Sequence, residues 1–243
     1  MINLSEEKYK DISYNIVFKN ETQNKPVIFF FHGFGGNRNL GPSGQDEVFA
    51  RMGYCVVVMD AYEHGDRRSE AYETFDNSTR QAMIIDIEIK TAHDAVSLYN
   101  HLEETGKISR DYPLGIYGVS MGGAIVFYLA SIFDKVKVLV SIVGSPSFVD
   151  FYQYKQEVYG FPKNREYHER LKKYHDYDPL INYQKLLNKH IFMSVGLQDR
   201  IVPLDYAKAL SKKIDTVYQE YDLGHESNQE MLEQANKFVK QYL

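Results

Sequence analysis

Residues 114–133 read LGIYGVSMGGAIVFYLASIF, and this stretch decides the fold. Its 20 residues carry no charge, which is the length of a membrane-spanning helix. Four glycines and Ser120 interrupt the stretch, however, and glycines of this kind mark turns rather than a continuous helix. The pattern therefore favours a buried strand, a tight turn and a buried helix, and we expect no membrane span.

The turn carries a recognisable pattern, because Gly118-Val119-Ser120-Met121-Gly122 fits G-x-S-x-G between a strand and a helix. In such a turn the serine has a strained backbone, and the flanking glycines let neighbouring backbone pass closely. The Met121 N–H, at the start of the helix, then points toward any oxyanion formed at Ser120. Five-residue matches occur by chance, so a plain glycine- and serine-rich turn is the alternative. The strand before and the helix after favour a nucleophilic serine.

A nucleophilic serine needs a basic histidine that is oriented by an acid, and on this type of sheet the chain order is serine, acid, histidine. Asp199 and His225 follow in that order, each in a loop just after an expected strand. Both loops fall at the carboxyl ends of their strands, where Ser120 also lies. Asp205 and Asp222 are rival acids, but the first falls in an expected helix and the second is too near the strand of the histidine. We therefore expect Ser120, Asp199 and His225 to form a catalytic triad.

A second oxyanion donor is expected in the loop after the first buried strand, where the sequence reads His32-Gly33-Phe34-Gly35-Gly36. Glycines there let backbone N–H groups face a substrate oxygen. The Phe34 N–H is our choice of donor beside Met121, and Gly35 is its rival. His32 comes too early in the chain to be the base, so we expect it to orient or pack the loop.

Strands alternate with helices along the chain, which predicts a mostly parallel sheet with helices on both faces. Residues 14–18 alternate in the manner of an edge strand, and residues 60–80 look like a polar loop. Residues 145–189 break the alternation with seven tyrosines and many charges. We expect one domain, 1–243, with 145–189 as an inserted cap; a homodimer surface and a solvated outer face are the alternatives for this insertion. Further strands are expected at 26–31, 54–59, 113–117, 136–143, 190–195 and 216–221.

Composition excludes several classes of function. Hydrophobic residues make up 44% and charged residues 25%, and the net charge is −5, so neither disorder nor nucleic-acid binding is indicated. The single cysteine, Cys55, lies within an expected strand and reads as an inert core residue. A lone cysteine fits a reducing compartment, so we expect a cytoplasmic protein. No metal-binding or cofactor-binding pattern is present, and we expect no cofactor.

These residues together resemble the α/β-hydrolase superfamily over nearly the whole chain, through His32–Gly36, Gly118–Gly123, Gly196–Asp199 and Gly224–His225. The stretch from Asp60 to Arg67, DAYEHGDR, is similar to the D-x-x-x-H-G-x-R loop of small bacterial esterases, relatives of the dienelactone hydrolase and prolyl oligopeptidase groups. The resemblance implies a mostly parallel sheet of about eight strands and a cofactor-free serine hydrolase. Dienelactone hydrolases typically use a cysteine nucleophile, so Ser120 argues against their substrate.

The resemblance also bears on His64 and Arg67, which are candidates for binding an anionic group of the substrate. The reading we prefer is that His64 and Asp60 tie down the loop beside the site, because surface loops must satisfy their backbone. The leading hypothesis is a serine hydrolase that cleaves small carboxylic esters through an acyl-enzyme. A small-peptide or amide hydrolase with the same triad is the alternative, and a non-catalytic ligand-binding protein on the same fold is a third reading.

Overall fold

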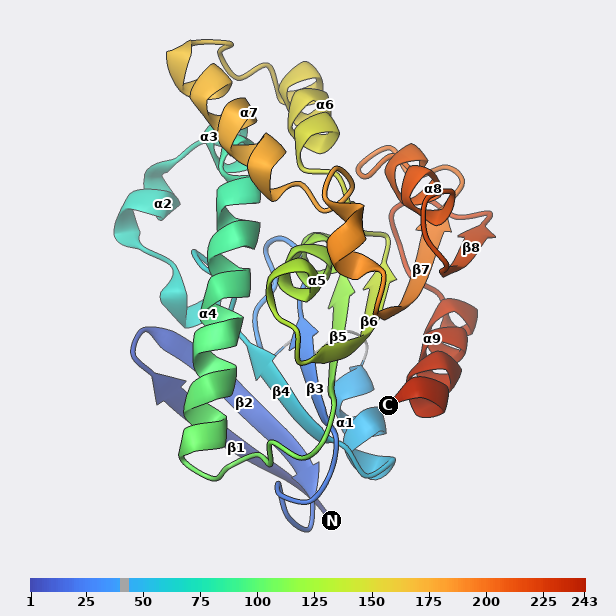
Figure 1. Cartoon of the computed structure of the whole chain (residues 1–243). Helices are drawn as coiled ribbons and strands as arrows, with labels where there is room; N and C mark the ends of the chain where they lie inside the picture. The colour runs from blue at the N-terminus through green and yellow to red at the C-terminus, as the bar shows by residue number, and fades with distance from the viewer. Residues whose placement is uncertain (40–43) are drawn as a thin grey trace.

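The computed structural model describes residues 1–39 and 44–243, and they form an eight-stranded sheet in the order β1-β2-β4-β3-β5-β6-β7-β8 (Figure 1). The pairs β1–β2 and β2–β4 are antiparallel, and the other pairs are parallel. The expected mostly parallel sheet is therefore confirmed. The strands are β1 Ile2–Tyr9, β2 Ile12–Lys19, β3 Val27–Phe31, β4 Cys55–Met59, β5 Leu114–Val119, β6 Val136–Ile142, β7 His190–Gly196 and β8 Val217–Tyr221.

The antiparallel margin differs from the expectation. Residues 14–18 do not form the edge: they belong to β2, which is buried between β1 and β4. Polar residues are tolerated there because they have partners; buried Asn15, for example, donates to Asn39 Oδ1 at 3.0 Å. The true edge strand is β1, whose side chains are all half-buried or exposed and whose pairing with β2 supplies its hydrogen bonds.

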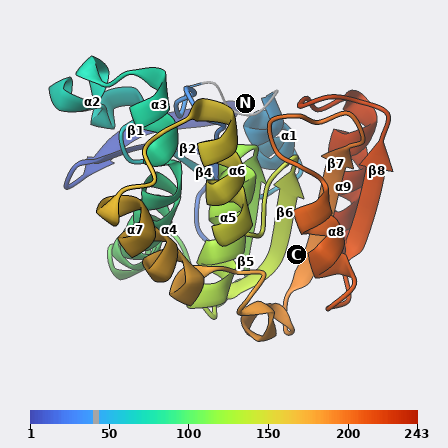
Figure 2. The same ribbon diagram turned by 90° about the horizontal axis from the view of Figure 1, so that it is seen from above.

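Helices cover both faces of the sheet, as expected (Figure 2). One apolar cluster joins the sheet to α4 and α5, and the buried Phe127 of α5 belongs to it. A second cluster joins the opposite face to α1 and α9 through Phe49 and Phe238. Each face is thus sealed by helices, which leaves the carboxyl ends of the strands as the place for a ligand site. The helices are α1 Gln45–Arg51, α2 Glu70–Thr74, α3 Asn77–Ala82, α4 Ile84–Glu104, α5 Met121–Ile132, α6 Val149–Tyr159, α7 Arg165–Tyr177, α8 Asp205–Ser211 and α9 Gln229–Tyr242, with short 3-10 helices at Gly65–Arg67 (η2) and Tyr183–Leu186 (η3).

Residues 60–80 are not a plain loop, because they contain η2, α2 and most of α3. Ser69 and Asp76 cap α2 and α3: each side chain accepts a hydrogen bond from the backbone N–H three residues later. A serine or aspartate of this kind marks the first turn of a helix, but hydrophobic periodicity does not reveal helices this short.

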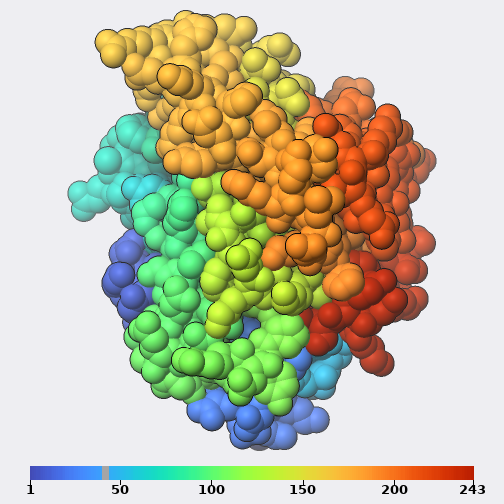
Figure 3. All heavy atoms as spheres, viewed as in Figure 1, coloured from blue at the N-terminus to red at the C-terminus, as the bar shows by residue number. Residues whose placement is uncertain are grey.

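Residues 145–189, the 145–189 segment below, form α6, α7 and η3 between β6 and β7. The segment lies across the top of the molecule, above the strand ends (Figure 1), and its yellow and orange spheres cover that end in the space-filling view (Figure 3). Asp178 ties its parts together, since its buried carboxylate accepts from the N–H groups of Phe148 and Val149 at 2.8 Å and from those of Leu180 and Ile181 at 2.8 and 3.0 Å.

None of the helices in the described part of the chain is both long enough and apolar enough to cross a bilayer.

Candidate active site

Ser120 occupies a sharp turn between β5 and α5. Its φ of 56° and ψ of −116° are strained for a residue with a side chain. The flanking glycines make the turn sterically feasible. A Cβ on Gly118 would lie 2.0 Å from the Gly122 carbonyl oxygen, and a Cβ on Gly122 would lie 2.1 Å from the carbonyl oxygen of Phe31. Only glycine fits at both positions, so the sequence pattern is a direct consequence of how tightly three backbone segments meet.

His225 and Asp199 lie in loops that follow β8 and β7. Ser120 Oγ is 2.7 Å from Nε2 of His225, and Nδ1 of the same ring is 2.7 Å from Oδ2 of Asp199. The carboxylate accepts the Nδ1–H, which leaves Nε2 free to accept the serine proton. The other carboxylate oxygen accepts from the N–H groups of Ile201 and Val202 at 2.8 and 2.9 Å, so Asp199 is held in place.

Backbone contacts join the two loops that carry Asp199 and His225. The N–H of Leu197 donates to Tyr221 O at 2.8 Å, and that of Gln198 donates to Leu223 O at 2.9 Å. The rival acid Asp222 accepts instead from the side chain of Gln198, and Asp205 begins α8. Within the described residues, Asp199 is the carboxylate that contacts the His225 ring.

Two backbone N–H groups flank the serine. Met121 is the first residue of α5, and a first helical N–H has no acceptor within its own helix. The loop after β3 passes beside the serine, since a Cβ on Gly33 would lie 3.6 Å from Ser120 Cβ. Phe34 and Met121 both line the cavity that contains Ser120. Gly35 has a φ of 79° and forms part of the turn in this loop rather than of the cavity wall.

His32 and His64 orient this loop. Nε2 of His32 accepts from the Ala61 N–H at 3.1 Å, and its Nδ1–H donates to Gly33 O at 2.8 Å. The ring of His64 stands edge-on to Phe34, with centroids 5.3 Å apart, and also lies 5.4 Å from the ring of His32. Burial lowers the pKa of His32, and burial lowers the pKa of His64 to about 4, so both rings are neutral at pH 7.

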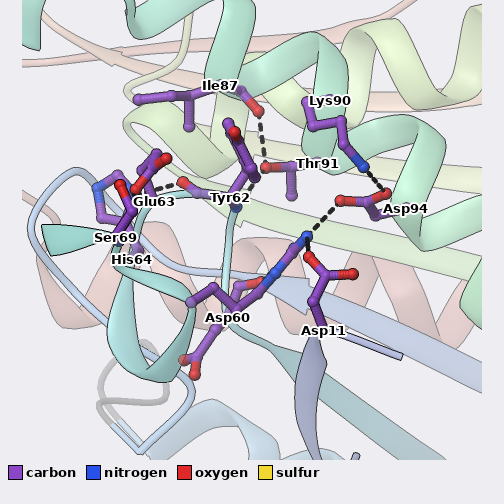
Figure 4. A network of polar contacts seen from close by, with 11 residues as sticks. Asp11, Asp60, Tyr62, Glu63, His64, Ser69, Ile87, Lys90, Thr91 and Asp94 are labelled. Carbon is purple, nitrogen blue, oxygen red and sulfur yellow. Dashed lines mark hydrogen bonds and ion pairs between the residues drawn. The ribbon is translucent and has the colours of Figure 1, made fainter. Parts of the chain in front are cut away.

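Arg67 belongs to a network of polar contacts, and Figure 4 labels its partners Asp11, Asp60 and Asp94. Its guanidinium donates to Asp60 O at 3.1 Å, to Asp11 at 2.9 Å and to Asp94 at 2.5 Å, and its side chain is 1% exposed. The Asp60 carboxylate, fully buried, accepts from the N–H groups of Arg38 and Asp66 at 2.7 and 3.0 Å. Arg67, Asp60 and His64 are therefore placed to hold the loop after β4, and they are absent from the described residues that line the cavity around Ser120.

Ser120 opens on a cavity of about 470 Å³ that lies between the strand ends and the 145–189 segment. Helix α6 contributes Phe151, Lys155 and Tyr159 to its wall. Gln81 of α3 and Glu88 of α4 also line it, and neither they nor Lys155 were expected from the sequence. For Glu88 a signal was present, because the charge falls in the run Ile84-Ile85-Asp86-Ile87-Glu88-Ile89, where a carboxylate on either face of the helix meets apolar neighbours.

Among the described residues, no three histidine, cysteine, aspartate or glutamate side chains come together as a metal site. Cys55 lies buried in β4, and burial raises the pKa of its thiol to about 12. The thiol is therefore an inert core group, as expected.

A hydrolase family and a curated relative each match most of this chain. Residues 14–225 match the family described as "Dienelactone hydrolase family". "Putative esterase YitV" of Bacillus subtilis (strain 168) is 26% identical over 232 residues, which cover 91% of this chain and 86% of that protein. Because the match spans most of both chains, the relationship concerns the whole fold and not one motif.

Solved structures share the fold at low sequence identity. TT1662 from Thermus thermophilus superposes with a TM-score of 0.76 at 14% identity, covering 99% of this chain and 98% of that one. Acetyl xylan esterase 1 from Thermoanaerobacterium sp. JW/SL YS485 gives 0.72 at 18% identity, covering 99% and 87%. Other similar structures include both esterases and peptidases. Family and fold together support a hydrolase of ester or peptide type. The chain belongs to the dienelactone hydrolase family, within the α/β-hydrolase superfamily.

Proposed function

We propose that this protein is a serine hydrolase of small carboxylic esters that works through an acyl-enzyme. Two contacts of 2.7 Å carry the proposal, one from Ser120 to His225 and one from His225 to Asp199. Ser120 and His225 line the cavity. A strained serine that lines a cavity and contacts an imidazole held by a carboxylate is the arrangement that activates a hydroxyl for attack on a carbonyl.

In the proposed reaction, Ser120 Oγ attacks the ester carbonyl while His225 Nε2 takes the hydroxyl proton. The Asp199 carboxylate stabilises the imidazolium that forms. The N–H groups of Phe34 and Met121 donate to the oxyanion, and each such donor is worth about 3–4 kcal/mol in comparable sites. His225 then gives its proton to the leaving alcohol. Water then attacks the acyl-enzyme while His225 Nε2 takes a proton from it, and this proton passes to Ser120 Oγ as the bond to the acyl group breaks and the acid is released.

We further propose that the 145–189 segment is a cap over this site. Support comes from α6, whose Phe151, Lys155 and Tyr159 form one wall of the cavity. In this role the segment excludes water and selects among acyl or alcohol groups, while the sheet supplies the reacting residues.

The test of the proposed nucleophile is the intact mass of the protein after incubation with a fluorophosphonate. We expect one adduct on the wild type and none on Ser120→Ala, with loss of ester hydrolysis by orders of magnitude in the variant. Asp199→Asn should also lose most activity, whereas Asp222→Asn, which alters the rival carboxylate, should keep it. A folded wild type without an adduct would refute the proposal and favour a non-catalytic ligand-binding protein.

Amide hydrolysis is the second candidate, because the similar structures include peptidases. The same residues would serve, so only the leaving group differs. A matched pair of an ester and an anilide with one acyl group separates the two candidates. We expect kcat/KM for the ester to exceed that for the anilide by more than the difference in leaving-group reactivity. A comparable kcat/KM for the anilide would favour the peptidase assignment.

A further inference from the structure

The cavity beyond Ser120 is lined by two buried charged side chains, Glu88 of α4 and Lys155 of α6, whereas Glu226, which also lines it, is exposed. Most of its wall is apolar or belongs to the reacting residues. Glu88 is 0% exposed and Lys155 is 3% exposed, so bulk water solvates neither group freely. Gln81 of α3 lies in the same wall. Charged groups are costly to bury, so a site of this kind calls for an explanation.

Contacts within the protein do not supply that explanation. Both carboxylate oxygens of Glu88 and the side-chain oxygen of Gln81 are buried without a hydrogen-bond partner among the described residues. Among the described residues, no hydrogen bond or ion pair joins Lys155 to Glu88. The Lys155 ammonium packs instead against the rings of Phe151 and Tyr159, at 4.8 and 5.2 Å from their centroids. A structural ion pair would bring the two charged groups together, and here they stay out of contact.

The electrostatics of the pair agree with this geometry. Burial raises the pKa of Glu88, and the ammonium of Lys155 opposes that rise. Burial also lowers the pKa of Lys155 to about 8, against the opposing attraction of Glu88 and Asp199. Each group thus loses hydration, and the charge of its neighbour compensates for this loss only in part. A polar ligand atom that hydrogen-bonds to both groups would compensate for more of it.

The donors and acceptors in this part of the cavity wall define which ligand group can bind there. Glu88 and Gln81 offer unpartnered acceptors, and Lys155 offers donors. An ammonium ligand only donates and would be repelled by Lys155, whereas a carboxylate ligand only accepts and would leave the acceptors of Glu88 and Gln81 without a donor. A neutral hydroxyl donates to the carboxylate and accepts from the ammonium at once.

We propose that Glu88 and Lys155 form a specificity subsite that selects esters carrying a hydroxyl group close to the scissile carbonyl. The inference rests on the proposed function, because the subsite lies in the cavity of Ser120. A site built to hydrogen-bond a hydroxyl rejects the analogue that lacks it, since its buried polar groups are then left unpaired.

The first test uses wild-type enzyme and three matched pairs of butyrate-type esters. p-Nitrophenyl 3-hydroxybutyrate against p-nitrophenyl butyrate places the hydroxyl on the acyl side. Glyceryl monobutyrate against propyl butyrate places hydroxyls on the alcohol side. Butyrylcholine against 3,3-dimethylbutyl butyrate adds a cation without a hydroxyl. We expect kcat/KM to favour the hydroxylated member of at least one pair by about 10- to 100-fold.

The second test uses variants that remove the polar groups while keeping the volume, Glu88→Leu and Lys155→Met. Each should abolish the hydroxyl preference, because kcat/KM for the hydroxylated ester falls by more than kcat/KM for the plain ester. Asp86→Asn is the matched control: it alters another carboxylate of α4, which pairs with Lys173 at 2.7 Å outside the cavity, and should keep the preference. Fluorophosphonate labelling of Ser120 in each variant reports whether the site is assembled.

The outcomes separate the two proposals. Hydrolysis of the plain esters with equal kcat/KM for the hydroxylated ones would overturn the subsite and leave the esterase assignment standing. A preference for butyrylcholine over its neutral isostere would also overturn it, in favour of a cation site. A hydroxyl preference that survives Glu88→Leu and Lys155→Met would show that other groups recognise the hydroxyl. Failure of the wild type both to label and to hydrolyse any ester would refute the proposed function itself.

Discussion

Replacing His64 with glutamine is expected to make the protein less sensitive to acid. The ring of His64 is buried against Phe34 and His32, and its Nδ1 lies 2.9 Å from Tyr62 O. Burial lowers its pKa from about 6.5 to about 4 in the folded protein, and the neighbouring His32 and Arg68 act in the same direction. A glutamine side chain keeps a donor near Tyr62 O but cannot take up a proton.

The direction of this pH dependence follows from proton binding by His64 in the folded and unfolded states. Because the folded-state pKa is the lower one, the unfolded chain binds a proton first as the pH falls. The stabilising contribution is therefore complete above pH 6.5, is lost between about pH 6.5 and pH 4, and does not change further below that. With values of about 6.5 and about 4, the free energy of unfolding falls by about 2 kcal/mol from pH 7.5 to pH 5.0 on account of this one side chain.

Urea unfolding at pH 7.5 and pH 5.0, followed by far-ultraviolet circular dichroism, measures this difference. We expect His64→Gln to lower the pH dependence of the free energy of unfolding by about 2 kcal/mol over that interval. His32 remains in both proteins, so its own contribution cancels to first order. His175→Gln is the control, since that side chain is 64% exposed on α7, and it should keep the wild-type dependence. An unchanged pH dependence in His64→Gln would refute the reasoning.

Three further predictions concern the turn, the 145–189 segment and the proposed subsite. Gly122→Ala should destabilise the protein by about 1–3 kcal/mol and abolish hydrolysis, because the new Cβ meets backbone at 2.1 Å. Gly224→Ala is the control, because there is open space around its Cβ, and in urea unfolding it should have the stability of the wild type. Equal stability of Gly122→Ala and Gly224→Ala would contradict the prediction. Asp178→Asn should cost about 3 kcal/mol and lower Tm by about 6–12 °C in calorimetry, because an amide NH₂ must face backbone donors. Asp176→Asn, at a 75% exposed side chain, should leave Tm unchanged, and a similar Tm for both would argue against the clamp. The hydroxyl preference should decline between pH 7 and pH 9.5 as Lys155, whose pKa is about 8, loses its proton near Glu88 and Asp199. The ratio of kcat/KM for the matched esters measures this, since the chemistry at Ser120 cancels, and a constant ratio would count against the role of Lys155.

The parallel part of the fold was predictable because its strands are short apolar runs buried on both faces. Val27–Phe31 and Cys55–Met59 are examples, and each is followed by a polar or glycine-rich loop. The antiparallel strands β1 and β2 at the margin of the sheet were not predictable in the same way. Strand β1 has no side chain that is fully buried, so its conformation comes from pairing with β2 and leaves no apolar periodicity to read.

The arrangement of the candidate site was predictable to a similar degree. Ser120 lies in a turn whose glycines are required locally, and the positions of Asp199 and His225 follow from parallel strands that end at one edge. The structure brings these three side chains into contact, while their catalytic roles stay predictions. For His64 and Arg67 the sequence left two readings open, and the contacts place both in the loop network (Figure 4).

Glu88 and Lys155 show why the other residues of the cavity could not be predicted from the sequence. Sequence patterns indicate that Glu88 falls among isoleucines, but its surroundings depend on where α6 and α3 lie, and α6 is far from Glu88 in the chain. The turn at Ser120 differs because backbone meets backbone there, so its requirement appears as glycine at fixed spacing. The proposed nucleophile can thus be recognised from local constraints, whereas the proposed choice of substrate depends on tertiary contacts of the 145–189 segment. Substitutions at Lys155 should therefore change which ester is cleaved while leaving the fluorophosphonate reactivity of Ser120 intact.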